Sequence, residues 1–219
     1  ISHDIRTPLS MILGYASELE ESPELPEEQR RQAGIIRRQG EKLRSLVRDL
    51  NLVSMLEYDM QPLHLERVRL PSLARQAAAD MLNGGLDERY AIELRLADEE
   101  ALINGDKKLL LRAIGNLLQN SVNHNPEGCR IAIETYLSED RTRCCLAVRD
   151  DGRGVPREQL AELTELPYAS KRKKPPRNGH GLGLPMVARI AKAHHGRLLL
   201  GSPDGGGFIA TLEFPAEGA

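Results

Sequence analysis

The segment SHDIRTPLSMILGYASELEESPELP, residues 2–26, indicates how the chain begins to fold. Its apolar residues are spaced alternately four and three positions apart, which is the pattern of a helix that packs along one seam. These residues are Ile5, Leu9, Ile12, Ala16 and Leu19. Pro23 and Pro26 then interrupt the pattern, because proline lacks a backbone donor and crowds the preceding turn. We therefore expect a helix over residues 1–21 and a break over residues 22–26.

A second and longer helix is predicted from about Pro26 to about Glu57, with an apolar residue at every seventh position: Ile36, Leu43 and Leu50. Two long helices with a short connection form an antiparallel hairpin, here over residues 1–58. Such a hairpin cannot bury both seams alone, whereas two copies can bury them in a four-helix bundle. We therefore expect a homodimer. The alternative is that the hairpin packs on the C-terminal part of its own chain.

Residues 58–65 have no seam and are expected to form a linker to a second domain over residues 65–219. Helix and strand patterns alternate there. Strands are expected at 65–70, 91–96, 101–104, 130–137, 143–149, 197–200 and 208–214, and helices at 71–82, 106–124, 156–163 and 184–194. The intervening loop 166–180 is long enough for a lid. The predicted fold class is α+β: a helical hairpin followed by an α/β domain whose antiparallel or mixed sheet is covered by helices.

Composition narrows the range of functions. Hydrophobic residues make up 40% of the chain and charged residues 28%, enough for a folded core. A net charge of −2 and 3% aromatic residues argue against nucleic-acid binding. The three cysteines have neither disulfide nor zinc spacing, so we expect buried thiols in a reducing compartment. No apolar run approaches the roughly 20 residues of a membrane helix. The first residues, Ile-Ser-His, suggest a fragment of a longer protein.

His3 is the first candidate for chemistry. On a helical wheel it lies about 160° from the apolar seam and faces water. Thr7 shares this outward face one turn later, and Asp4 adjoins His3 in the chain. An accessible imidazole near its usual pKa is a competent nucleophile, and a carboxylate that holds one ring nitrogen improves the other. The alternative is a solvated histidine without a role.

A polar stripe runs along residues 116–124, NLLQNSVNH, within the helix expected over 106–124. Asn116, Asn123 and His124 fall within about 60° of Asn120, and leucines occupy the opposite side. Asparagine is a poor helix former, so the stripe favours a function over a merely solvated face. Amide oxygens suit Mg²⁺, and amide and imidazole N–H groups can bind phosphates.

Two glycine-rich segments follow. In DDGRGVP, residues 150–156, Asp150 ends a strand and Gly152 and Gly154 allow a tight turn. A buried carboxylate accepts hydrogen bonds from exocyclic amines, so Asp150 suits adenine, although a surface turn would use the same residues. GHGLGL, residues 179–184, leads into a helix whose first N–H groups can bind phosphate. Its candidate residues are Gly179, His180, Gly181, Leu182 and Gly183. The basic run that starts at Lys171 is either solvated or closes over the γ-phosphate.

These segments, in this order, resemble the sensor histidine kinases of two-component systems. SHDIRTPL resembles the H box of that family, NLLQNSVNH the N box, DDGRG the G1 box and GHGLGL the G2 box. The resemblance spans the chain and implies a dimerisation and phosphotransfer hairpin, followed by an α/β sandwich ATP-binding domain of the kind shared with gyrase and Hsp90. It also implies ATP and Mg²⁺ as cofactors, a response regulator as partner, and a cytoplasmic location for this portion of a membrane-anchored sensor.

By the same resemblance, His3 is the phosphoacceptor, Asp4 assists its imidazole, and Thr7 positions water to dephosphorylate the regulator. Asn120 is a ligand of Mg²⁺, Asn116 supports the phosphate site and Asp150 holds adenine. The chain departs from the family at Asn123, where lysine is frequent, and at His124, where tyrosine is common. The aromatic F box is also hard to find. Two other functions therefore remain open: a conformational ATPase of the gyrase or Hsp90 type, and a degenerate kinase that serves as a scaffold.

Overall fold

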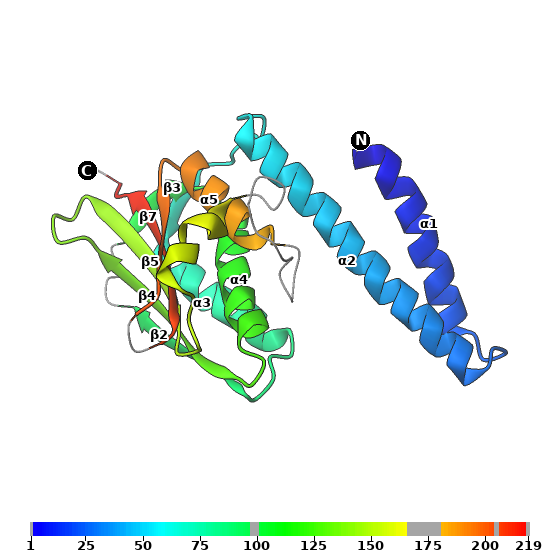
Figure 1. Ribbon diagram of the computed structural model, residues 1–219. Coiled ribbons are helices and arrows are strands. Elements are labelled where there is room, and N and C mark those ends of the chain that lie inside the picture. The colour runs from blue at the N-terminus through cyan, green and yellow to red at the C-terminus, as the bar shows by residue number, and fades with distance from the viewer. Residues whose placement is uncertain (1, 97–100, 166–180, 204–205, 218–219) are drawn as a thin grey trace. The chain divides into compact units, whose positions relative to one another are not determined.

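The computed structural model describes residues 2–96, 101–165, 181–203 and 206–217, with side chains from residue 5 onward. It divides into two compact units, Ile1–Met55 and Leu56–Ala219, and each unit is described by itself. Figure 1 shows the helical unit and the unit that contains the sheet. Within the described residues, no helix is both long and apolar enough to span a bilayer.

The first unit is the predicted hairpin of α1 (Ser2–Glu21) and α2 (Glu27–Glu57), although the last two residues of α2 belong to the second unit. Leu13 packs directly on the backbone of Gly40, because a Cβ on that glycine would lie 2.7 Å from Leu13 Cδ2. Nearer the connection, Nε of Arg37 donates to Oε2 of Glu20 over 2.5 Å. The end of α1 thus meets the beginning of α2, as in an antiparallel pair.

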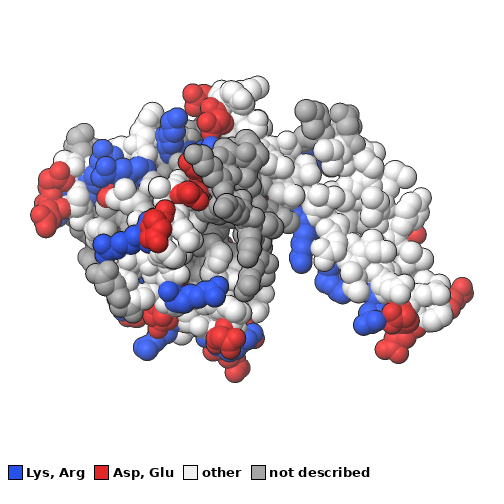
Figure 2. All heavy atoms as spheres, in the orientation of Figure 1, with Lys and Arg blue, Asp and Glu red and all other residues white. Residues whose placement is uncertain are grey.

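The residues of the predicted apolar seam of α1 differ in burial. Leu9 and Ala16 are buried, whereas Ile5, Ile12 and Leu19 remain 39–49% exposed. On α2, Ile36, Leu43 and Leu50 are 40–51% exposed. A single partner helix covers only one flank of each helix, so an apolar residue stays uncovered at every seventh position. We call these six residues the exposed stripes; they are Ile5, Ile12, Leu19, Ile36, Leu43 and Leu50. The face of the hairpin in view in Figure 2 is largely uncharged, and acidic and basic side chains gather near its loop.

The second unit contains a mixed five-stranded sheet in the order β2-β4-β5-β7-β6. Its strands are β2 (Tyr90–Leu96), β4 (Cys129–Leu137), β5 (Arg143–Asp150), β6 (Arg197–Gly201) and β7 (Phe208–Pro215). β2 is parallel to β4, and all the other neighbours are antiparallel. A separate antiparallel pair joins β1 (Glu66–Arg69) to β3 (Leu102–Gly105). The predicted mixed sheet is confirmed.

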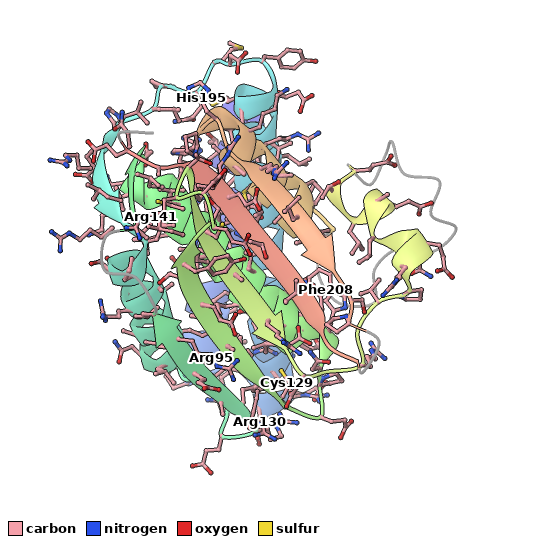
Figure 3. All side chains as sticks on the ribbon, turned by 90° about the vertical axis from the view of Figure 1, so that its left-hand side faces the viewer. Arg95, Cys129, Arg130, Arg141, His195 and Phe208 are labelled. Carbon is pink, nitrogen blue, oxygen red and sulfur yellow. The ribbon has the colours of Figure 1, made fainter. Side chains whose placement is uncertain are left out.

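Three helices, α3 (Leu70–Asn83), α4 (Lys107–His124) and α5 (Gly183–Ala193), cover one face of the sheet (Figure 1). The core lies between these layers and is mainly aliphatic, with Phe208 and Phe214 as its buried aromatic residues. Its largest fully buried side chains include Leu110, Ile114, Leu117, Leu118, Ile131, Ile133, Leu146 and Met186. Figure 3 looks onto the opposite face of the sheet, which these helices leave open.

Local differences from the predicted elements are small. The strand expected over 65–70 ends at Arg69, and Leu70 is the first residue of α3, which has a proline in its first turn. The prediction of a helix over residues 156–163 is wrong. Two 3₁₀ turns, Arg157–Gln159 and Ala161–Thr164, replace it, and the backbone closes over three residues instead of four. The predicted lid, residues 166–180, lies outside the described residues. All three cysteines are buried free thiols, as expected.

Candidate nucleotide pocket and phosphoacceptor helix

A pocket opens where the C-terminal half of α4 meets the end of β5. Its polar lining combines two groups predicted from separate sequence segments, the stripe on α4 and the carboxylate at the end of a strand. Apolar side chains from the 3₁₀ turn Ala161–Thr164, from α5 and from β7 complete the wall. The lining residues are Asn120, His124, Asn125, Asp150, Arg153, Gly154, Val155, Leu163, Leu184 and Phe208.

Asp150 is the last residue of β5 and is only 3% exposed. The hydroxyl of Ser121 donates to its Oδ2 over 2.9 Å, and the backbone N–H of Gly152 donates to its Oδ1 over 3.0 Å. The carboxylate is therefore oriented from two sides. A carboxylate offers about four acceptor positions, so two such bonds leave capacity for a ligand.

Asp150 also acts on its surroundings. The thiol of Cys129 is buried nearby, and burial together with the charge of Asp150 raises its pKa to about 11. This thiol is therefore neutral at physiological pH and is not a nucleophile.

Asp151, the next residue, points elsewhere. Its Oδ1 accepts from the backbone N–H of Arg130 over 2.7 Å, and its Oδ2 lies 3.2 Å from Nε of the same residue. Asp151 is exposed and does not line the pocket. The two adjacent carboxylates thus have different surroundings, and only Asp150 is available to a molecule in the pocket.

The loop after β5 is held by the glycine-rich turn that precedes β7. Gly154 has a φ of +69°, and a Cβ there would lie 2.6 Å from the carbonyl oxygen of Gly207. The backbone N–H of Gly207 donates to the carbonyl oxygen of Gly152 over 2.6 Å. The hydroxyl of Ser202 accepts from Val155 N–H and donates to the carbonyl oxygen of Gly207. Glycine is needed on both sides because the two backbones touch.

The four predicted members of the polar stripe do not share one environment. Asn120 and His124 line the pocket, whereas Asn116 and Asn123 do not. Nδ2 of Asn116 donates to the carbonyl oxygen of Arg112, and its Oδ1 would be 3.4 Å from a Cβ on Gly183. Oδ1 of Asn123 accepts from Gln119 over 3.0 Å. The stripe therefore reaches two places: the pocket and the beginning of α5.

The beginning of α5 matches the predicted glycine-to-helix turn. Gly181 has a φ of +69°, Leu182 is buried, and the helix starts at Gly183 without a side-chain cap. Uncapped N–H groups at a helix N-terminus favour an anion. Lys171, Gly179 and His180 lie outside the described residues.

Several lining residues were missed by the sequence analysis, and Asn125 is the most informative of them. It is 8% exposed, its Nδ2 donates to the carbonyl oxygen of Ser121, and its own carbonyl oxygen accepts from the hydroxyl of Tyr90. Its side chain occupies the space that a Cβ on Gly152 would need, 1.9 Å away. In the sequence, Asn125-Pro126 indicates only the end of a helix.

The phosphoacceptor candidates lie on α1. His3 and Asp4 belong to this helix, and their side chains are outside the described set. Thr7 is exposed, as the helical wheel predicts. Pro8 lies within the helix, where its ring removes a backbone donor one turn after Asp4.

The donor chemistry of the pocket fits Mg²⁺ held together with phosphates. Among the described residues, no three His, Cys, Asp or Glu side chains gather into a metal cluster. The amide of Asn120 nevertheless faces the pocket, and no hydrogen bond within the described part of the chain engages it. An amide oxygen is a hard ligand, and Mg²⁺ often combines one or two protein oxygens with phosphates and water.

Comparisons with known families agree with this geometry. The family described as histidine kinase-, DNA gyrase B-, and HSP90-like ATPase matches residues 105–218, slightly more than half of the chain. The His Kinase A (phospho-acceptor) domain matches residues 1–59. The sheet unit is thus an ATP-binding domain of the class shared by histidine kinases, gyrase B and Hsp90. With a phosphoacceptor hairpin before it, the chain belongs to the sensor histidine kinases and comprises their catalytic core.

Individual proteins show the same likeness. Sensor histidine kinase YvrG of Bacillus subtilis is 29% identical over 219 residues, which cover 99% of this chain and 37% of that protein. Full-length ShkA in complex with AMPPNP is 28% identical with a TM-score of 0.80, over 98% of this chain and 44% of that one. ThkA in complex with response regulator TrrA shares the fold at 19% identity and a TM-score of 0.64, over 98% and 59%. The chain therefore spans little more than a third of YvrG.

Proposed function

We propose that this chain transfers the γ-phosphoryl group of ATP to His3 and then to an aspartate of a response regulator. The observation that carries the proposal is the oriented, buried carboxylate of Asp150 in a pocket whose other wall is the amide face of α4. The order of a phosphoacceptor hairpin and this pocket in one chain supports it further.

In this proposal the pocket binds adenine through Asp150, which accepts a hydrogen bond from the exocyclic amine. Leu163, Leu184 and Phe208 provide apolar contact for the ring. The phosphates extend toward the first turn of α5 at Gly181 and Gly183, where backbone N–H groups point at the ligand. The remaining candidate contacts are Asn116, Asn123, His124, Gly152, Gly154, Lys171, Gly179, His180 and Leu182.

Asn120 holds Mg²⁺ through its amide oxygen, and the ion, when bound, neutralises phosphate charge. Asn120→Ala is expected to weaken the Mg²⁺ dependence of nucleotide binding, with the affinity for Mg²⁺-free nucleotide unchanged. Gln119→Ala, on the exposed side of the same helix, is the matched control. Equal Mg²⁺ dependence in both variants would remove this assignment.

In the transfer step, a ring nitrogen of His3 attacks the γ-phosphorus in line with the bond to the β–γ bridging oxygen. The N–P bond forms, the P–O bond breaks and ADP leaves with the bond electrons. Asp4 accepts from the other ring N–H and so keeps the attacking nitrogen unprotonated. The phosphoryl group then moves from nitrogen to a carboxylate oxygen of the regulator. Thr7 orients water for the later hydrolysis of that acyl phosphate. The ThkA–TrrA complex supports a response regulator as the partner class.

The exposed stripes support a homodimer. Six apolar residues on two helices are left 39–51% exposed, and a second hairpin would cover them in a four-helix bundle. The longer protein would carry its sensing and membrane-anchoring segments outside this chain.

Incubation with Mg²⁺ and γ-labelled ATP tests the proposal. The wild-type protein should acquire a label that is labile in acid and stable in alkali, as expected of phosphohistidine. His3→Gln should abolish the label. His64→Gln, at an exposed histidine outside both candidate sites, should retain it. ADP and free phosphate without labelled protein would instead favour a conformational ATPase, and failure to bind ATP would favour a scaffold.

A further inference from the structure

His194 is buried at the C-terminal end of α5, and both of its ring nitrogens are engaged. The backbone N–H of Asp106 donates to Nε2 over 2.9 Å, and Nδ1 lies 2.7 Å from the carbonyl oxygen of Ile190. A backbone N–H only donates and a carbonyl oxygen only accepts. The ring therefore carries a single proton, on Nδ1, and is neutral.

Asp106, the partner of His194, joins two other segments. Its Oδ1 accepts from Lys108 N–H and Leu109 N–H, which caps α4. Its Oδ2 accepts from the backbone N–H of His64 in the segment between α2 and β1. One residue thus connects that segment, the first turn of α4 and, through His194, the last turn of α5.

The close approach of the ring depends on a neighbouring glycine. A Cβ on Gly105 would lie 3.3 Å from Cδ2 of His194 and 2.7 Å from Cδ1 of Leu110. The ring also meets Phe214 edge to face, with centroids 6.2 Å apart. The imidazole is therefore fixed by packing as well as by hydrogen bonds.

α5 runs antiparallel to the N-terminal half of α4, and one contact lies at each end of this shared stretch. Asp106 and His194 meet at one end, and Asn116 and Gly183 approach at the other. The two spans match in length, because ten residues of α4 and eleven of α5 each rise about 15–17 Å. Figure 3 shows the two ends through their neighbours: His195 lies at one end of the sheet and Phe208, which lines the pocket, at the other.

We propose that neutral His194 is a positioning residue for the nucleotide site. By fixing the C-terminal end of α5 to the beginning of α4, it sets the register of α5 along α4. That register determines where the glycine turn at Gly181 and Gly183 meets Asn116 and the phosphates. The inference rests on the proposed binding of ATP in this pocket and names a residue about 15 Å away that adjusts it.

The proposal predicts a specific pH dependence. Protonation would place a donor on Nε2 against the donor N–H of Asp106 and so break the contact. Among the described residues, three ionisable groups face the ring: Asp106 before α4, His195 after α5 and Glu217 after β7, which lines the same cavity and pairs with Arg67. Burial lowers the pKa of His194 more than Asp106 and the Ile190 carbonyl raise it. The contact is therefore intact near neutral pH, and it is lost only when the pH falls through this lowered pKa, below the ordinary histidine value of about 6.5.

The test compares His194→Leu, His194→Gln and the neighbouring control His195→Gln in the folded protein, with circular dichroism to verify folding. Calorimetric Kd for AMPPNP and KM for ATP are measured from pH 5.5 to 8. Leucine leaves the Asp106 N–H unpaired and so releases the C-terminal end of α5 from the beginning of α4. The Kd for AMPPNP and the KM for ATP should therefore rise about tenfold at pH 7.5, while kcat changes little. Glutamine can accept from that N–H and does not titrate. It should keep wild-type affinity and remove the rise in KM that the wild-type protein shows at low pH. His195→Gln should match the wild type at pH 7.5.

A lower melting temperature in His194→Leu with wild-type Kd and KM would overturn the proposal, because the residue would then be only structural. The same holds if His194→Gln keeps the pH dependence of the wild type. If the wild-type protein binds AMPPNP but is not phosphorylated, only the proposed function is contradicted. The comparison of Kd values would still test the role of His194, because it measures nucleotide binding and not phosphorylation.

Discussion

The hydroxyl of Ser121 donates to Oδ2 of Asp150 over 2.9 Å and joins α4 to the end of β5 inside the pocket. Ser121 directly follows Asn120, so this bond fixes the turn of α4 that directs the side-chain amide of Asn120 toward the pocket. The carbonyl oxygen of the same serine accepts from Nδ2 of Asn125. The buried Ser121 thus connects the end of β5, the turn that carries Asn120 and the end of α4.

Asp150→Asn should raise the Kd for AMPPNP at least about tenfold, because a hydrogen bond to a charged group contributes roughly 1.5–3 kcal/mol. The adjacent variant Asp151→Asn is the control, since that carboxylate is exposed and pairs with Arg130 outside the pocket. Calorimetric titration of both proteins checks the prediction. Equal losses in the two variants, or none in either, would contradict the assignment of adenine to Asp150.

Gly207→Ala should destabilise the protein and weaken nucleotide binding. Its φ is +88°, and a Cβ would lie 2.3 Å from the carbonyl oxygen of Asp150. Gly85→Ala is a matched control, because its φ is +84° with nothing within 4 Å. The control measures only the loss of stability from an alanine in the left-handed backbone region, about 1–2 kcal/mol. Thermal unfolding should show a larger fall for Gly207→Ala, and only that variant should bind AMPPNP less tightly. A Gly207→Ala protein no less stable than Gly85→Ala would show that the backbone contact relaxes freely.

Leu43→Gln should weaken dimerisation, because it places a polar group in one of the exposed stripes. Leu43 is 46% exposed in the single chain, so the stability of the monomer should change little. Lys42→Gln, at the neighbouring exposed position, is the control. Sedimentation equilibrium over a range of concentrations should show a higher dissociation constant for Leu43→Gln only. A monomeric wild-type protein, or equal constants in the two variants, would argue against dimerisation through the stripes.

Asp140 provides a prediction about pH. Its Oδ1 accepts from the hydroxyls of Ser138 and Thr142 and from the backbone N–H of Thr142, and these bonds lower its pKa to about 2. A lowered folded-state pKa stabilises the protein above the unfolded value near 3.8, and this contribution is lost as the pH falls toward 2. Asp140→Asn should therefore melt below the wild type at pH 6, and the difference should shrink near pH 2.5. Glu139→Gln should show no such trend, and a constant difference for Asp140→Asn would contradict the ionic origin.

Local patterns in the sequence predict much of this structure. The seven-residue spacing of apolar residues predicts the hairpin, and glycines mark both loops of the pocket. Each of these signals acts within a few residues of where it is read. Asp150 was found for the same reason, since a carboxylate that ends a buried strand stands out.

The features that were missed arise from contacts between distant segments. Phe208 enters the pocket because the sheet brings β7 beside β5, and Asn125 enters it because the loop at Gly152 packs against the end of α4. His194 follows the last residue of α5, and nothing near it in the sequence indicates Asp106, 88 residues away. The division of the α1 seam also depends on which flank α2 covers. Periodicity identifies the apolar face of a helix but not the partner that buries each part of it.

The bond between Asp106 and His64 uses the backbone N–H of His64, while the side chain of that histidine is exposed. Nineteen of the twenty amino acids can supply this donor, and proline alone cannot. Position 64 is therefore free to vary in sequence while its attachment to α4 stays the same. An alignment of relatives would show a variable residue at a point where the chain is firmly held, and a proline scan would reveal it.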